Sequence, residues 1–211
     1  MTPELPRKDL VLLLADRNMV SALQGLLERH ESLAIRLVEA EFFVHPDRDP
    51  ACLLRSHEFL RPFVKQYDHA LVLFDREGCG KERLSREELE RQVEGRLSAS
   101  GWERRSAAVV LDPELEVWVW SDSPHVEDVL GWTGRIPGLR SWLDNQGLFE
   151  LADAKPRRPK EAMQMALRAS RKPRSSSLYF QLAKRVSLTG CIDPAFRKFR
   201  DTLQSWFPPE Q

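Results

Sequence analysis

The sequence DLVLLLA at residues 9–15 contains the longest unbroken apolar run of the chain, from Leu10 to Ala15. A continuous apolar run of this length is typical of a β-strand that is buried on both faces, as in parallel sheets. Residues 18–30 (NMVSALQGLLERH) follow almost at once and place their apolar side chains at helical spacing, with Asn18 as the predicted N-cap. The start of the chain therefore predicts a buried strand that leads into an amphipathic helix.

The same alternation continues along the next eighty residues. Apolar runs predict a strand region within 33–44 and strands at 69–74 and 107–111, while helical spacing predicts helices over 51–67 and 85–100. Ser85 and Glu88 have the spacing of a capping box at the start of the third helix. Because parallel strands need crossover helices, the pattern predicts an α/β fold with a parallel-rich sheet flanked by helices.

The pattern changes after residue 121, where prolines and glycines interrupt a segment rich in tryptophan. Beyond it, helices are predicted near 160–170, 177–187 and 194–206. We therefore divide the chain into an α/β domain, residues 1–150, and a basic helical C-terminal region, residues 151–211. The tryptophans between 118 and 142 are expected to form core between the two parts rather than an exposed interface.

The composition is that of an ordinary globular protein, with 211 residues, 42% hydrophobic and 30% charged. No apolar run approaches the roughly 20 residues that a membrane-spanning helix needs, and the first residues lack the features of a secretory signal. A cytoplasmic protein is expected. The three cysteines are widely spaced and odd in number, so we expect free thiols in a reducing compartment.

The formal net charge of zero conceals two parts of opposite sign. Residues 155–200 contain 13 Lys or Arg and two acids, an excess of 11 positive charges that the rest of the chain balances. Such a segment binds the phosphates of a nucleic acid, docks on the acidic part of its own chain, or only keeps the protein soluble, and the sequence leaves these open. The residues predicted to contact nucleic acid are Lys155, Arg157, Arg158, Lys160, Arg171, Lys172 and Arg174.

Acidic residues follow three of the predicted strands. They are Asp16 after the first, Asp75 and Glu77 after the third, and Asp112, Glu114 and Glu116 after the fourth. In open α/β sheets, ligands bind at the carboxyl ends of the strands, where these residues are expected to meet. If strand geometry continues past residue 74, Asp75 and Glu77 point to the same side and favour a hard cation such as Mg²⁺ or Mn²⁺. Glu116 is either a first-turn partner of a helix dipole or a metal ligand.

Three motifs resemble a known family. The sequences LFDREGCG at 73–80, DPELEVWVWSD at 112–122 and DPAFRKF at 193–199 are similar to segments of small TOPRIM-like proteins associated with bacterial anti-phage defence. TOPRIM domains bind Mg²⁺ and act on phosphodiester bonds. The resemblance implies that Asp75 and Glu77 take the Asp-x-Asp place and that Glu116 and Asp122 complete a metal site. In the family, a Glu-Gly pair follows the first strand, and Ala15-Asp16 stands at this point of the sequence. The resemblance therefore implies that Asp16 takes the catalytic role of the family's glutamate.

Two functions follow from the resemblance. The first is a Mg²⁺-dependent or Mn²⁺-dependent nuclease or phosphodiester hydrolase of a defence system, with Asp16, Asp75, Glu77 and Glu116 as catalytic residues. The second is a catalytically silent TOPRIM-like subunit that binds nucleic acid or another protein of the same system. A phosphoacceptor receiver domain is disfavoured, since the paired acid after the first strand and the lysine after the fifth are not found at the expected places.

Overall fold

The computed structural model describes residues 6–121, 123–150, 153–188 and 191–210. Within these ranges, β1 (Lys8–Leu14), β2 (Ala40–Val44), β3 (Tyr67–Asp75) and β4 (Ser106–Leu111) form one parallel sheet in the order β2-β1-β3-β4. Residues 10–14 of β1 and 70–74 of β3 are fully buried, as the continuous apolar runs predict. The predicted α/β fold with a parallel sheet is confirmed.

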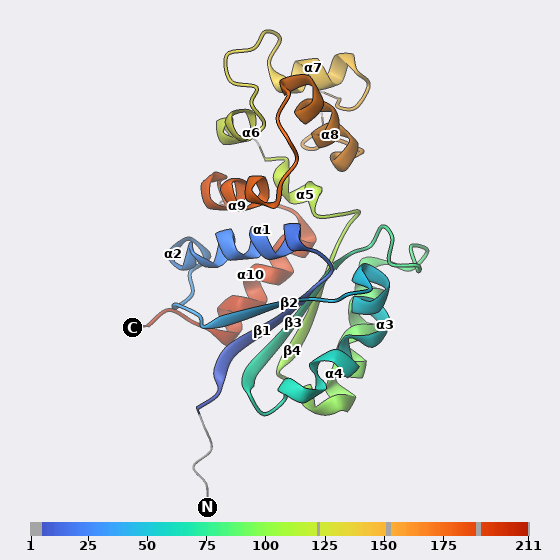
Figure 1. Cartoon of the computed structure of the whole chain (residues 1–211). Helices are drawn as coiled ribbons and strands as arrows, with labels where there is room; N and C mark the ends of the chain where they lie inside the picture. Colours follow the sequence, from blue (N-terminus) through green and yellow to red (C-terminus); the bar gives the residue numbers. More distant parts are fainter. Residues whose placement is uncertain (1–5, 122, 151–152, 189–190, 211) are drawn as a thin grey trace, which may run out of the picture.

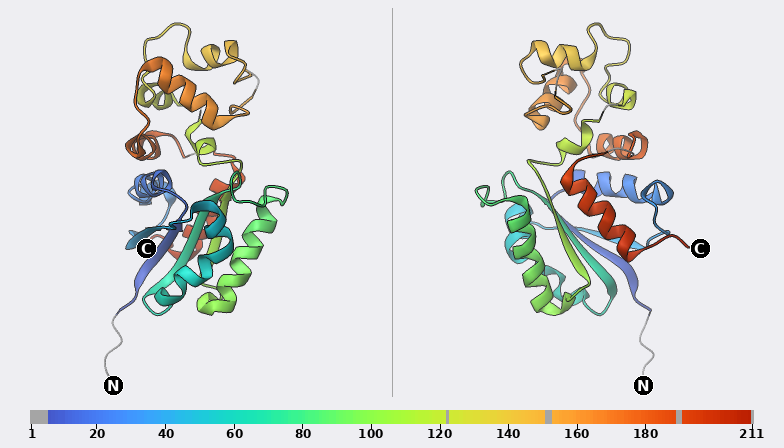
Figure 2. Two further views of the ribbon diagram at one scale, coloured as in Figure 1. Left: turned by 45° about the vertical axis from the view of Figure 1, so that its right-hand side comes forward. Right: turned by 180° about the vertical axis from the view of Figure 1, so that it is seen from behind.

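Helices cover both faces of the sheet. α3 (Arg48–Leu60) and α4 (Arg86–Leu97) lie on one face, whereas α1 (Arg17–Leu27) and α10 (Pro194–Trp206) lie on the other (Figure 1 and Figure 2). Short pieces complete this part: α2 (His30–Leu33), a 3₁₀ turn (Arg61–Phe63) and a π-helical turn (Ser98–Trp102). Across the described ranges, every helix is too short or too polar to cross a lipid bilayer.

Several boundaries differ from the sequence expectations. The second strand starts at Ala40 rather than near residue 33, because Ala34 adopts a left-handed conformation that ends α2 and leaves the next residues irregular. The N-cap of α1 is Asp16 and not Asn18, since the Asp16 carboxylate accepts a hydrogen bond from the backbone N of Met19. The helix expected over 51–67 starts at Arg48 and ends at Leu60.

The remaining helices lie beyond the carboxyl ends of the strands. They are α5 (Glu116–Val119), α6 (Pro124–Val129), α7 (Leu139–Asn145), α8 (Pro159–Ser170) and α9 (Ser176–Arg185), which we call the helical unit (Figure 1). Trp120 and Trp132 are buried, and Trp118 and Trp142 are partly buried against the core, so the tryptophan segment packs inside the protein as expected. The helical unit contains helices from both sides of residue 150, since α6 and α7 precede it and α8 follows it. The domain boundary at residue 150 therefore stays a prediction.

Gly25 brings the helical unit into close contact with the α/β domain. A Cβ atom at Gly25 of α1 would lie 2.7 Å from the carbonyl oxygen of Phe180 and 2.9 Å from the Cβ of Ala183, both in α9. We therefore expect Gly25→Ala to lower the free energy of unfolding by about 1–3 kcal/mol in chemical denaturation. Gly95→Ala in α4 is the matched control. No atom lies within 4 Å of a Cβ there, so helix propensity should raise stability by about 0.5–1 kcal/mol. Equal effects at both positions would contradict this packing.

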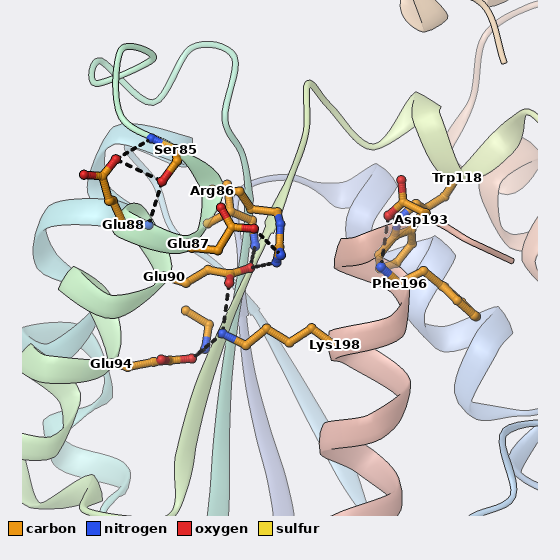
Figure 3. Close-up of polar contacts among 12 residues, drawn as sticks. Ser85, Arg86, Glu87, Glu88, Glu90, Glu94, Trp118, Asp193, Phe196 and Lys198 are labelled. Carbon is orange, nitrogen blue, oxygen red and sulfur yellow. Dashed lines mark hydrogen bonds and ion pairs between the residues drawn. The ribbon is translucent and has the colours of Figure 1, made fainter. Parts of the chain in front are cut away.

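The C-terminal helix is fixed to the sheet by apolar and charged contacts. Phe199 and Leu203 of α10 are fully buried. Lys198 of the same helix donates to Glu90 at 3.0 Å and to Glu94 at 2.6 Å, as Figure 3 shows. Glu90 is also paired with Arg86 at 2.7 Å, so a buried carboxylate is shared by two cations. These contacts hold α10 against α4 beside β4, the strand at the edge of the sheet.

Candidate functional site

Asp75, the last residue of β3, contacts two other segments at the carboxyl end of the strand. The backbone N of Asp75 donates to the Asp49 carboxylate at 2.8 Å, and Asp49 lies in the first turn of α3. The Asp75 carboxylate in turn accepts from the backbone N of Leu115 at 2.8 Å. Asp75 therefore connects the first turn of α3 to the segment that follows β4.

Burial raises the pKa of the Asp75 carboxyl well above its ordinary value, and the negative charges of Asp49, Glu116, Asp16 and Glu114 raise it further. Burial also raises the pKa of Asp49. Among the described residues, no ion pair is formed by Asp16, Asp49 or Asp75. The sheet edge thus has an excess of negative charge that would be relieved by a proton or a bound cation.

Two further carboxylates at this edge are neutralised by the helical unit. Glu114 is buried and accepts from Lys160 twice, from the ammonium group at 2.7 Å and from the backbone N at 3.1 Å. Glu116 is buried as well and accepts from Arg174 at 2.6 Å and from the Tyr179 hydroxyl at 2.5 Å.

The pKa values of these partners reflect the same contacts. Burial alone would lower the pKa of Lys160, but the hydrogen bond and charge of Glu114 outweigh it and raise the value. Burial and the charge of Glu116 raise the pKa of Tyr179. The Tyr179 hydroxyl therefore stays protonated and donates to Glu116.

Among the residues that the structure describes, the predicted metal ligands are not brought together. β3 ends at Asp75, so the strand geometry expected to align Glu77 with it does not continue, and Glu77 is exposed in the following turn. Glu116 is paired with Arg174, and Asp122 lies outside the described residues. Asp16 caps α1. Oxygen donors suit Mg²⁺, but no three His, Cys, Asp or Glu side chains in the described ranges are placed to hold one ion.

Asp49 is the residue that sequence reasoning missed. It lies between Pro46 and Pro50, after the strand region predicted within 33–44 and before the helix predicted over 51–67, and prolines at such positions favour turns. The usable signal was Pro50, since proline is common in the first turn of a helix, where Asp49 also lies. An acid in a first turn beside a parallel sheet can reach the carboxyl ends of the strands.

Most of the predicted nucleic-acid-binding residues are paired with acids of the same chain. The pairs are Lys155 with Asp193, Arg157 with Glu150 and Asp153, Arg158 with Glu161, Lys160 with Glu114, and Arg174 with Glu116. Docking on the chain itself accounts for Lys160 and Arg174, whose partner carboxylates are buried, whereas Arg157 and Arg158 stay more than half exposed in their pairs.

Arg171 and Lys172 are different from the other five. Together with Arg168 they line an open groove of about 470 Å³ at the end of α8, and Arg174 lies at the same groove. No ion pair to any of these three side chains is found in the parts of the chain that the structure describes. The groove is therefore one place where positive charge is available to an external anion.

Comparison of the chain with protein-family models, with curated proteins and with solved structures gave no match.

Proposed function

We propose that this protein binds nucleic acid and hydrolyses its phosphodiester bonds with the aid of Mg²⁺ or Mn²⁺, as part of bacterial anti-phage defence. The reaction and the biological setting are those that the resemblance to TOPRIM-like defence proteins implies. The observation that carries the proposal is the Asp75 carboxyl, whose pKa is raised by burial and by four neighbouring carboxylates. Such perturbed groups at the carboxyl end of a parallel sheet are typical of functional sites.

Asp75 would hold the cation together with Asp49 and Asp16, which also lack a cationic partner in the described chain. These side chains would have to come closer together than they are here. When bound, a divalent cation lowers the pKa of a water molecule and stabilises negative charge on a phosphate. Arg174 lines the basic groove and also donates to Glu116, so it connects the groove to the acidic sheet edge. A phosphate backbone in the groove would thereby be positioned beside the carboxylates.

A second candidate function is a silent subunit that binds nucleic acid or another protein of the defence system. The ion pairs of Lys160 with Glu114 and of Arg174 with Glu116 favour it, since they neutralise two of the five clustered carboxylates without a metal ion. The two candidates differ in whether phosphodiester bonds are cleaved.

A cleavage assay with plasmid and oligonucleotide substrates separates the candidates. With Mg²⁺ or Mn²⁺ we expect cleavage by the intact protein, and at least a ~100-fold slower reaction after Asp75→Asn, because a ligand carboxylate is lost. Glu77→Gln is the matched control and should retain most of the activity, since Glu77 is exposed in a turn. Absence of cleavage by the intact protein, with binding retained, would establish the silent subunit instead.

Binding through the groove is tested by its dependence on salt. Replacing Arg168, Arg171 and Lys172 by Gln should weaken binding and reduce the slope of log affinity against log salt by up to about 0.9 per phosphate contact. Replacing Arg157 and Arg158 by Gln is the control, because both are already paired with acids of the chain. Fluorescence anisotropy with a labelled duplex measures both quantities. Equal losses in the two variants would remove the groove from the proposal.

A further inference from the structure

A cavity of about 450 Å³ lies between the α/β domain and the helical unit. Its walls come from α1, the segment around α5, α9 and the start of α10, and they include Leu26, Leu115, Val119, Leu182 and Phe196. This volume is within the range of sites that hold small organic molecules. The lining is largely apolar, which suits a ligand with an aliphatic or aromatic body.

Two polar groups at the cavity have unused hydrogen-bonding capacity. The ammonium group of Lys155 lies 3.7 Å from Asp193, beyond hydrogen-bond distance, so its N–H donors find no acceptor among the described residues. Asp193 itself is occupied, because it accepts from the Trp118 indole and from the backbone N of Phe196 (Figure 3). The hydroxyl oxygen of Ser121, which also lines the cavity, is buried and has no hydrogen-bond partner in the described chain.

We propose that this cavity binds a small amphipathic carboxylate, with its apolar body among the leucines and its carboxylate at Lys155 and Ser121. A buried polar oxygen without a partner costs free energy, and a ligand acceptor would remove that cost. Lys155 would form a charge-assisted hydrogen bond to the carboxylate.

The cavity also adjoins the candidate functional site. The ring of Tyr179 forms part of the cavity wall, while its hydroxyl donates to Glu116 at the sheet edge. A bound ligand would therefore contact a side chain that positions one of the clustered carboxylates. The binding proposal does not depend on nuclease activity and is tested without it.

Decanoate is a suitable probe, since it combines an apolar chain with one carboxylate. We expect saturable quenching or a spectral shift of tryptophan fluorescence, because Trp118 and Trp120 line the cavity. We also expect decanoate to slow alkylation of Cys191 by iodoacetamide at least fivefold. Cys191 lines the cavity and is partly exposed, whereas Cys52 and Cys79 are buried. Decanol and acetate, which each lack one half of the probe, should bind more weakly.

Two variants test the roles of the polar groups. Lys155→Met should weaken decanoate binding about tenfold and leave decanol binding unchanged, and Ser121→Ala should weaken decanoate binding by a smaller factor. Lys184→Met is the control, because Lys184 is paired with Glu28 away from the cavity lining. Equal binding of decanoate and decanol, unchanged affinity in Lys155→Met, or absence of Cys191 protection would each overturn the proposal.

Discussion

Asp75→Asn should raise the melting temperature at pH 8 in the absence of divalent cations. The pKa of Asp75 is raised in the folded protein above its ordinary value of 3.8. Protonation of this carboxyl therefore stabilises the folded protein, and this contribution is fully present below pH 3.8. It is lost as the pH rises through the raised pKa. Asparagine removes the charge and can still accept from the backbone N of Leu115. We expect a gain of at least about 3 °C, which corresponds to roughly 1 kcal/mol in a domain of this size.

The pH dependence and the metal dependence make this prediction specific. Well below pH 3.8, the advantage of Asp75→Asn should disappear, because the carboxyl is then protonated in both the folded and the unfolded chain. Mg²⁺ or Mn²⁺ should raise the melting temperature of the intact protein and have little effect on the variant. Differential scanning fluorimetry across pH gives both results. A lower melting temperature for the variant at pH 8 would contradict an unfavourable charge at Asp75.

Arg174→Met should be strongly destabilising. It removes the cation from Glu116, which is 3% exposed and would keep the Tyr179 hydroxyl as its remaining hydrogen-bond donor. A carboxylate left buried without its cation costs about 3 kcal/mol, and urea denaturation should show a loss of this order. Combining Arg174→Met with Glu116→Gln should recover much of the loss, because no uncompensated charge remains.

Arg158→Met is the matched comparison for Arg174→Met. Arg158 also forms an ion pair, with Glu161 at 2.8 Å, but both side chains are more than half exposed. An exposed pair of this kind contributes at most about 1 kcal/mol. Similar losses in the two arginine variants would show that burial of Glu116 does not govern the energetics of the site.

The sheet could be predicted from the sequence because its signals are local. The continuous apolar run in β1 and the Ser85–Glu88 capping box both depend on residues close in the chain. The structure contains the strand and the capped helix at those positions. The sequence also showed that acidic residues follow the predicted strands. The structure confirms that Asp75 lies at the carboxyl end of a strand.

The partners of those acids could not be predicted, because they are set by contacts between residues far apart in sequence. Glu116 and Arg174 are 58 residues apart, and Lys160 is 46 residues from Glu114. Sequence patterns showed an excess of basic residues near the C-terminus, but not which of them would face an acid of the same chain. The strand predicted over 69–74 extends to Asp75, but strand geometry does not continue to Glu77, which lies in a turn rather than beside Asp75.

The position of α10 has a consequence for the order in which the chain can fold. Its buried residues Phe199 and Leu203 pack on the sheet side formed from strands that end by residue 111. During synthesis, the apolar surface beneath this helix stays accessible to water until residues 194–206 have been made. Removing α10 would leave that surface uncovered, and aggregation of the shortened product is the expected outcome.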